Sequence, residues 1–190
     1  MGSRVGDIAL NGDGSTEQSG GVPERVRRLR PEEYELIRTI RLRSLTLEPA
    51  AFGSTFEREA AFSDDDWRER LAPGASPHFV SVDDSGAPTG MVVGALDSQD
   101  QNVAHLFAMW VDPDARGSGT ADALVAEVVR WAVAQGCAEV HLRVTDGNER
   151  AERMYRRNGF ERTGQWWFRD RDGRVELELV NRLHRKPLVE

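Results

Sequence analysis

Segments with apolar residues at helical spacing alternate along the chain with short segments that read as strands. Order should begin near Val26, in the alternating stretch "VRRL". Pro31 suits the first turn of a helix, and an apolar side predicts that this helix continues to about Leu47. Ser63, followed by three aspartates, resembles an N-terminal cap with acids in the first turn and predicts a second helix.

The rest of the chain interleaves strands and helices. "HFVSV" and "TGMVVGAL" flank a hairpin loop, and "VAHLFAMWV" is the next strand. A helix is predicted from Thr120 to Gln135, then the strand "AEVHLRV", then a helix from Asn148 that Gly159 closes as a left-handed C-cap. "TGQWWFRD" and "RVELELV" flank an Asp-Gly hairpin turn. This order predicts a mixed α/β (α+β) domain.

Composition supports one domain with a tail. A chain of 190 residues, 39% of them apolar, suits a single core. Residues 1–22 are rich in glycine and lack aromatic side chains, so we expect a disordered tail before a folded domain over residues 23–190. No apolar run approaches the ~18 residues of a membrane span, and no export signal is visible. We therefore expect a cytoplasmic protein without a membrane partner.

Charge and cysteine content narrow the partners further. The net charge of −7 argues against nucleic acid as the main partner. The single cysteine, Cys137, cannot form an internal disulfide or build a zinc site, and we expect no metal. Cys137 lies between a predicted helix and a predicted strand, where a small buried thiol is common.

The stretch "MWVDPDARGSGTADAL", residues 109 to 124, places a glycine-rich turn between an apolar strand and an amphipathic helix. It has no lysine for a Walker A loop, and Asp122 occupies the third glycine position of a dinucleotide fingerprint. What is left is a run of backbone amides at a helix start, where the helix dipole helps to bind an anion. The amides are those of Gly117, Ser118, Gly119, Thr120 and Ala121. A flexible turn without a ligand stays open as the alternative.

Two motifs resemble the GNAT acyltransferase family. Arg116-x-x-Gly119-x-Ala121 matches the family's Arg/Gln-x-x-Gly-x-Gly/Ala signature after an apolar strand. The family's second block, Asn-x-x-Ala-x-x-x-Tyr-x-x-x-Gly-Phe, is matched by Asn148, Ala151, Tyr155, Gly159 and Phe160. The order of elements is similar over residues 24 to 183. The resemblance implies the GNAT fold, a mixed central sheet of about six to seven strands with about four helices.

The resemblance also implies an N-acetyltransferase in which an amine attacks acetyl-CoA directly, in a ternary complex. The turn from Gly117 to Ala121 would bind the pyrophosphate, with the charge of Arg116 nearby. The strand edge Met109–Val111 would offer backbone groups to the pantetheine arm. An amide at Met109 or Trp110 would polarise the thioester carbonyl. Alternation puts the side chains of these two residues in the core, on opposite faces.

Tyr155 is the candidate general acid for the departing thiolate. A tyrosine hydroxyl, with an ordinary pKa of ~10, stays protonated at neutral pH and can donate a proton or a hydrogen bond. Asn148 lies two helical turns earlier on the same face and would hydrogen-bond the arm. A core tyrosine whose hydroxyl happens to reach solvent stays open as the alternative.

The candidate general base is His105, on the cofactor strand, where other members of the family carry a base. Alternation would give it one buried face in common with Phe107, Met109 and Val111, so a structural role stays open. Family members that acetylate ribosomal protein N-termini place a glutamate base twelve residues before the tyrosine. This chain has Arg143 there, which weakens that interpretation.

The acceptor site should form from the segment after the first helix and from the last hairpin. Its aromatic candidates are Phe52, Phe56, Trp166 and Trp167, with core packing as the alternative. Glu57 and Glu59 are candidates to bind a cationic amine, although surface acids are the simpler interpretation. We expect a small-molecule primary amine as acceptor; the alternatives are a protein N-terminus or lysine, and a sensor without turnover. The sequence does not distinguish acetyl from other acyl groups, or a monomer from a homodimer.

Overall fold

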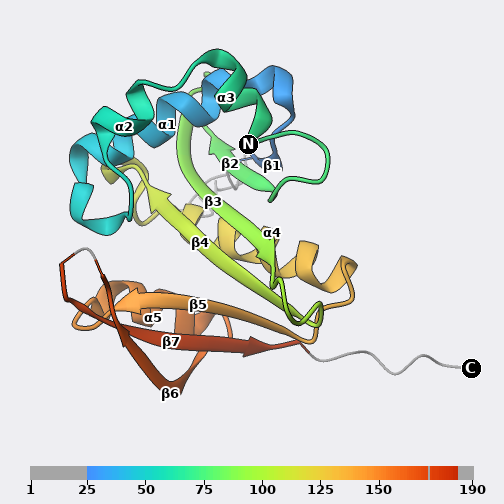
Figure 1. Cartoon of the computed structure of the whole chain (residues 1–190), viewed down its shortest axis with the longest axis vertical. Coiled ribbons are helices and arrows are strands. Elements are labelled where there is room, and N and C mark those ends of the chain that lie inside the picture. Colours follow the sequence, from blue (N-terminus) through green and yellow to red (C-terminus); the bar gives the residue numbers. More distant parts are fainter. Residues whose placement is uncertain (1–24, 171, 184–190) are drawn as a thin grey trace, which may run out of the picture.

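The computed structural model describes residues 25–170 and 172–183 (Figure 1). The tail predicted over residues 1–22 lies outside the described residues. The strands are β1 (Arg25–Arg28), β2 (His78–Val82), β3 (Pro88–Leu96), β4 (Val103–Val111), β5 (Glu139–Thr145), β6 (Glu161–Phe168) and β7 (Val175–Arg182). The α-helices are α1 (Tyr34–Leu47), α2 (Phe56–Ala60), α3 (Asp64–Glu69), α4 (Thr120–Ala134) and α5 (Glu149–Arg157). The strands form a 7-stranded sheet in the order β1-β2-β3-β4-β5-β7-β6, so the predicted mixed α/β class is confirmed.

Local signals set the helix ends as predicted. The Ser63 hydroxyl accepts a hydrogen bond from the Asp66 amide (3.2 Å), and the Asp66 carboxylate accepts one from the Ser63 amide (2.7 Å), a capping box for α3. The Asn148 side-chain oxygen accepts from the Ala151 amide at 3.2 Å and caps α5. Gly159 follows α5 with φ 85°, a conformation that favours glycine.

Two apolar clusters cover the two faces of the sheet. One joins α4 and α5 to the sheet and includes Leu124 and Tyr155. The other joins α1 and α3 to the opposite face and includes Ile40, Trp67 and Trp110. Figure 1 shows α1, α2 and α3 gathered beside β2 and β3, whereas α5 lies with β5 and β7. Different helices therefore cover the two halves of the sheet, α1 to α3 beside β2 and β3 and α5 beside β5 and β7. The boundary between the halves lies at β4 and β5.

β4 and β5 pair in parallel and then separate. Their ladder begins at Val103 opposite Glu139 and ends at Leu106 opposite Leu142. Beyond that row β4 continues along β3, and β5 continues along β7 (Figure 1). The facing edges of the two strands are therefore left without a strand neighbour, and their backbone groups border an opening in the sheet.

A bulge interrupts β4 beside this opening. Between Phe107 and Trp110 the register against β3 shifts by one residue. Two residues of β4, Ala108 and Met109, therefore oppose one residue of β3. Ala108 has φ 51°, which is uncommon for a residue with a side chain, and strained backbone of this kind clusters at functional sites.

The bulge makes one prediction wrong: His105 and Phe107 do not lie on a buried face with the later residues of β4. Cross-strand partners share a face, so the register shift puts Phe107 on the same side as Trp110, toward α1. Met109 and Val111 pack with the cluster under α4 instead. Phe107 is 46% exposed, because it lines a cavity rather than the core. The prediction that Met109 and Trp110 point to opposite faces is confirmed.

Three structural findings bear on what the chain binds. Cys137 is buried, and burial raises the pKa of its thiol, as expected for a structural cysteine. No helix within residues 25–170 and 172–183 combines the length and apolar character needed to cross a bilayer. The same residues contain no group of three or more His, Cys, Asp or Glu arranged to hold a metal ion.

Candidate active site

A cavity of about 1020 Å³ occupies the opening between β4 and β5. Its walls come from the end of α1 and the segment after it, β4, the turn before α4, β5, α5 and β7. Ten of the twelve predicted site residues line it: His105, Met109, Trp110, Val111, Arg116, Gly117, Gly119, Ala121, Asn148 and Tyr155. Ser118 and Thr120 are not among its lining residues; their hydroxyls lie 2.6 Å apart within the turn.

The glycine turn lies at the N-terminus of α4. Gly117 (φ 91°) and Gly119 (φ 93°) are both left-handed, and nothing lies within 4 Å of the position that a Cβ would occupy at either. Gly119 is the N-cap of the 15-residue helix α4, and no side chain caps the helix there. The turn therefore directs a helix N-terminus into open space in the cavity, an arrangement that suits an anion.

Asp122, the acid in the first turn of α4, is paired with α5. Arg157 donates two hydrogen bonds to its carboxylate, both at 2.6 Å, and the Asn158 side chain donates a third at 2.6 Å. The hydrogen bond from Arg157 is the main cause of the lowered pKa of Asp122. The negative charge beside the glycine turn is thus balanced by a guanidinium that itself lines the cavity.

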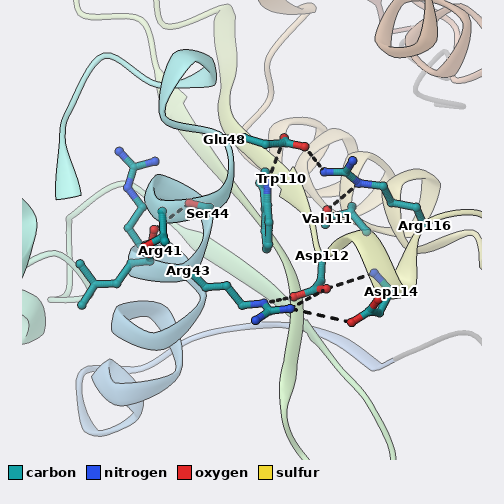
Figure 2. Close-up of polar contacts among 11 residues, drawn as sticks. Arg41, Arg43, Ser44, Glu48, Trp110, Val111, Asp112, Asp114 and Arg116 are labelled. Carbon is teal, nitrogen blue, oxygen red and sulfur yellow. Dashed lines mark hydrogen bonds and ion pairs between the residues drawn. The ribbon is translucent and has the colours of Figure 1, made fainter.

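Arg116 connects the glycine turn to α1 and β4. Its Nε donates to the carbonyl oxygen of Val111 at 3.0 Å, and its Nη2 donates to the carboxylate of Glu48 (Figure 2). The other oxygen of Glu48 accepts from the Trp110 indole at 3.1 Å. The guanidinium thus lies in a network of protein groups. Its contribution to binding a pyrophosphate stays a prediction. No sequence motif marked Glu48.

A second group of charges joins the same two elements. Arg43 of α1 donates two hydrogen bonds to Asp112, which follows β4, and its Nη2 lies 3.8 Å from the Asp114 carboxylate (Figure 2). The hydrogen bond from Arg43 is the main cause of the lowered pKa of Asp112. Together with Glu48, this pair fixes α1 relative to the turn that leads into α4.

The opening exposes particular backbone groups of β4. The Asp112 amide donates to β3, at the Thr89 carbonyl (2.8 Å), whereas the Val111 carbonyl faces away from β3 toward Arg116. Because successive residues of a regular strand direct their backbone groups to opposite sides, the Val111 amide faces the opening and the Trp110 amide faces β3. Met109 lies in the bulge, where this alternation is interrupted. Of the two amides considered for polarising a thioester, the geometry favours the one at Met109.

Tyr155 lies under the cavity floor with its hydroxyl at the surface of the cavity. The residue is 6% exposed, and its ring packs edge-on against Phe160 at 5.8 Å. Burial raises the pKa of its hydroxyl, which therefore stays protonated at neutral pH. Within the described residues the hydroxyl makes no hydrogen bond, yet it is not among the fully buried polar atoms without a partner. Some of its surface therefore faces the cavity.

Asn148 is exposed at the start of α5 and also lines the cavity. Its side-chain oxygen caps the helix, so the amide nitrogen is the group left to donate to a ligand. The capping bond holds the side chain in place.

His105 forms a dyad with Asp97. Its Nε2 lies 2.8 Å from the Asp97 carboxylate, and this hydrogen bond is the main cause of a pKa of about 2 for Asp97. An ionised carboxylate only accepts hydrogen bonds, so Nε2 carries the hydrogen and Nδ1 is the basic nitrogen. The side chain of His105 is 41% exposed and lines the cavity. Asp97 lies on the other side of the β3–β4 hairpin, and no local pattern marked it.

His141 is a cavity residue for which the sequence suggested no partner. It lies opposite His105 in the β4–β5 ladder, with ring centroids 6.1 Å apart. Its Nε2 lies 2.9 Å from Glu139, and its Nδ1 lies 3.3 Å from Glu178. Two histidines and their carboxylate partners thus lie where the two strands begin to separate.

Only some of the residues expected at the acceptor site line the cavity. Of the four aromatic candidates, Phe52 lines the cavity and Phe56, Trp166 and Trp167 do not. Glu59 is 1% exposed, so its interpretation as a surface acid is wrong. It accepts hydrogen bonds from Arg41 at 3.0 and 2.8 Å and from Arg70 at 3.3 Å, which explains how a carboxylate tolerates this burial. Glu57 is exposed, as expected.

Glu59→Gln should lower the free energy of unfolding by about 2 kcal/mol at neutral pH, because an amide cannot balance the guanidinium groups of Arg41 and Arg70. Burial alone would raise the pKa of Glu59, but the hydrogen bonds and charge of Arg41 outweigh it and lower the pKa. The carboxylate therefore stabilises the fold above its unfolded pKa of ~4.3, and this contribution is lost as the pH falls. Urea unfolding at several pH values measures the difference.

The control is Glu57→Gln, a like change at an exposed neighbour, which should leave stability unchanged. The gap between Glu59→Gln and the unmodified protein should shrink below about pH 4. A gap of equal size at pH 3 and pH 7 would show that the charge of Glu59 is not what stabilises the fold.

Comparisons with known proteins identify the family of the chain. Residues 38–160 match the family described as "Acetyltransferase (GNAT) family". The Pectobacterium atrosepticum protein "Acetyltransferase ECA0875" is 31% identical over 83 residues, which are 44% of this chain and 57% of that protein. The chain spans about half the length of the curated relatives that it matches.

Solved structures share the fold. A GNAT-family acetyltransferase from Streptococcus pneumoniae superposes with a TM-score of 0.71 at 16% identity, over 84% of this chain and 99% of that one. A phosphinothricin acetyltransferase from Sinorhizobium meliloti, in complex with AcCoA, superposes with a TM-score of 0.69 at 19% identity, over 89% and 93%. The resemblance that the two sequence motifs indicated is confirmed, and the chain belongs to the GNAT acetyltransferase family.

Proposed function

We propose that this protein transfers an acetyl group from acetyl-CoA to the primary amine of a small molecule, by direct attack in a ternary complex. One observation carries the proposal: the separation of β4 and β5 joins the glycine turn, the free edge of β4 and Tyr155 in a single cavity. When bound, acetyl-CoA supplies the acetyl group as a thioester.

The residues present fit this donor. The open space over Gly117 and Gly119 would admit the pyrophosphate to the amides that begin α4. Arg157 neutralises the Asp122 carboxylate, which would otherwise repel a pyrophosphate at this turn. The Met109 and Val111 amides would hold the arm, and the Met109 amide would stabilise the negative charge that develops on the thioester oxygen.

Two groups would move the protons. Nδ1 of His105, oriented by Asp97, would accept a proton from the acceptor amine, directly or through a water molecule. As the new C–N bond forms and the C–S bond breaks, the Tyr155 hydroxyl would donate to the departing sulfur. The acidic and the basic group lie on different strands and helices but reach the same cavity.

Thiol release from acetyl-CoA should require an amine and should be fastest with small primary amines. The panel should contain small amines, short peptides with free N-termini and lysine peptides, each compared with a reaction that lacks an acceptor. Release with peptides alone would favour a protein acetyltransferase. Tight binding of acetyl-CoA by calorimetry, with no release for any amine, would favour a sensor. Propionyl-CoA in parallel would show whether the donor is restricted to acetyl.

A further inference from the structure

Arg143 of β5 brings to the cavity a guanidinium that no protein group neutralises. The residue is exposed and lines the cavity. Its Cζ lies 4.1 Å from the centroid of the Trp167 ring. Across residues 25–170 and 172–183 it forms no hydrogen bond or ion pair. Stacking on an aromatic face orients the guanidinium plane while its N–H donors stay free for a ligand.

The expected partner of Arg143 is engaged elsewhere. Glu178 lies directly opposite it in the β5–β7 ladder, where opposite charges normally pair. Glu178 instead accepts a hydrogen bond from the Thr163 hydroxyl at 2.9 Å and lies 3.3 Å from Nδ1 of His141. The next acid on this wall, Glu176, lies 3.8 Å from Arg169. The acids that face the cavity here are thus paired with other groups, and Arg143 is not.

Arg143 lies at the level where the acetyl group would be transferred. It follows Leu142, the last residue of β5 that pairs with β4, so it lies where the two strands begin to separate, close to the start of the β4 bulge in the sheet. The glycine turn proposed for the phosphates lies beyond Val111, where β4 ends, whereas Arg143 is one residue past the last paired row of β4 and β5, Leu106 opposite Leu142. An anion bound by Arg143 would therefore belong to the acceptor rather than to CoA, and would lie close to the reacting nitrogen.

The opposite wall adds positive charge. Arg41 of α1 lines the cavity, and Glu59 occupies its Nε and Nη2. Its Nη1 is buried and has no hydrogen-bond partner within the described residues. The carboxylate of Glu59 is shared between Arg41 and Arg70, so one carboxylate faces two guanidinium groups here. A cationic acceptor with several amines would meet the guanidinium groups of Arg41 on this wall and Arg143 on the other.

We infer that the acceptor carries a carboxylate, or a similar anion, close to its reactive amine, as an amino acid does, and that Arg143 binds this anion. The inference rests on the proposed function and names its substrate class. The planar fork of an arginine matches a carboxylate through two parallel hydrogen bonds, which fixes both position and orientation. Holding the anion at Arg143 would leave the amine beside the two histidines and the thioester.

The test compares each L-amino acid with its α-amide, which has the same side chain but no negative charge. The unmodified protein should use the acid with a kcat/KM at least about 10-fold higher. Arg143→Gln should lower kcat/KM for the acid about 10- to 100-fold, mainly through KM, and leave the amide unaffected. The amine of an α-amide loses its proton more readily than that of the acid, so a preference for the acid cannot come from amine reactivity.

Two further variants sharpen the test. Arg143→Lys keeps the charge but not the fork and should recover part of the loss. Arg130→Gln makes the same change on the outer surface of α4 and should alter nothing. Calorimetric titration of the amino acids into the protein saturated with CoA measures the anion site without turnover.

The outcomes separate the two proposals. Equal use of acid and amide, or thiol release only with amines that lack an anion, would overturn the substrate class and leave the acetyltransferase standing. A preference for the acid that persists in Arg143→Gln would overturn the assignment of the anion site to Arg143. Arg143-dependent binding of amino acids without thiol release would support the anion site and contradict the transfer reaction. If neither thiol release nor Arg143-dependent binding were observed, both proposals would be overturned.

Discussion

Gly119→Asp should raise the Kd for acetyl-CoA at least about 100-fold, enough to abolish binding in an ordinary titration. Gly119 has φ 93° at the N-cap of α4, and its missing side chain would project into open space. A carboxylate there would lie within a few ångströms of the proposed pyrophosphate, where two unit charges repel by about 4 kcal/mol near a protein surface. It would also accept hydrogen bonds from the amides that begin the helix. Isothermal titration with acetyl-CoA gives the Kd.

The matched control is Gly74→Asp. Gly74 has φ 88° and nothing within 4 Å of a Cβ position, and it does not line the cavity. Both variants place aspartate in a left-handed conformation, at a strain of about 1–2 kcal/mol, so their melting temperatures should fall alike. Only Gly119→Asp should lose acetyl-CoA. Normal affinity in Gly119→Asp would mean that the pyrophosphate binds elsewhere.

Much of the fold could be predicted because its signals are local. The capping residues Ser63 and Asn148 and the left-handed Gly159 act within a few residues of their own positions, and the structure has each of them at a helix end. The turn Arg116–Ala121 is equally local, since it needs only a strand, two glycines and a helix in sequence. These features depend little on the rest of the chain.

The errors came from features that depend on distant residues. The bulge at Ala108 breaks the period of two on which the face of His105 was judged, and nothing near Ala108 in the sequence marks it. Glu59 reads as a surface acid because its partners, Arg41 and Arg70, come from other segments. The contact between Glu48 and Arg116 could not be predicted for the same reason, because 68 residues separate the two positions in the sequence.

The aromatic residues predicted to line the acceptor site also depend on contacts between distant segments. Trp167 does not line the cavity, but its ring supports Arg143, which does. The sequence marked Arg143 only as a departure from relatives with a glutamate there. Its part in an anion site depends on Glu178 being held by His141 and Thr163, an arrangement of β5, β6 and β7 that no single segment contains.

Tyr155→Phe should lower kcat about 100-fold and change the Kd for acetyl-CoA less than about twofold. The substitution removes one oxygen from a ring that packs against Phe160, so the cavity keeps its shape. The lost group is the proton donor for the departing sulfur, which is needed in the transition state rather than in binding. Because burial raises the pKa of the hydroxyl, the donor is protonated throughout the neutral range, and the loss should not vary between pH 6 and pH 9.

The value of kcat, measured at unchanged stability, separates this role from that of a core tyrosine whose hydroxyl reaches solvent. The Tyr155 hydroxyl makes no hydrogen bond within the described residues, so its removal should leave the melting temperature within about one degree of the unmodified protein. The control is Tyr34→Phe, at the other tyrosine of the chain, whose hydroxyl donates to Asp64 at 2.7 Å outside the cavity. Tyr34→Phe should keep full kcat. If Tyr155→Phe also kept full kcat, the departing sulfur would have to take its proton from solvent. Tyr155 would then be a core residue without a catalytic role.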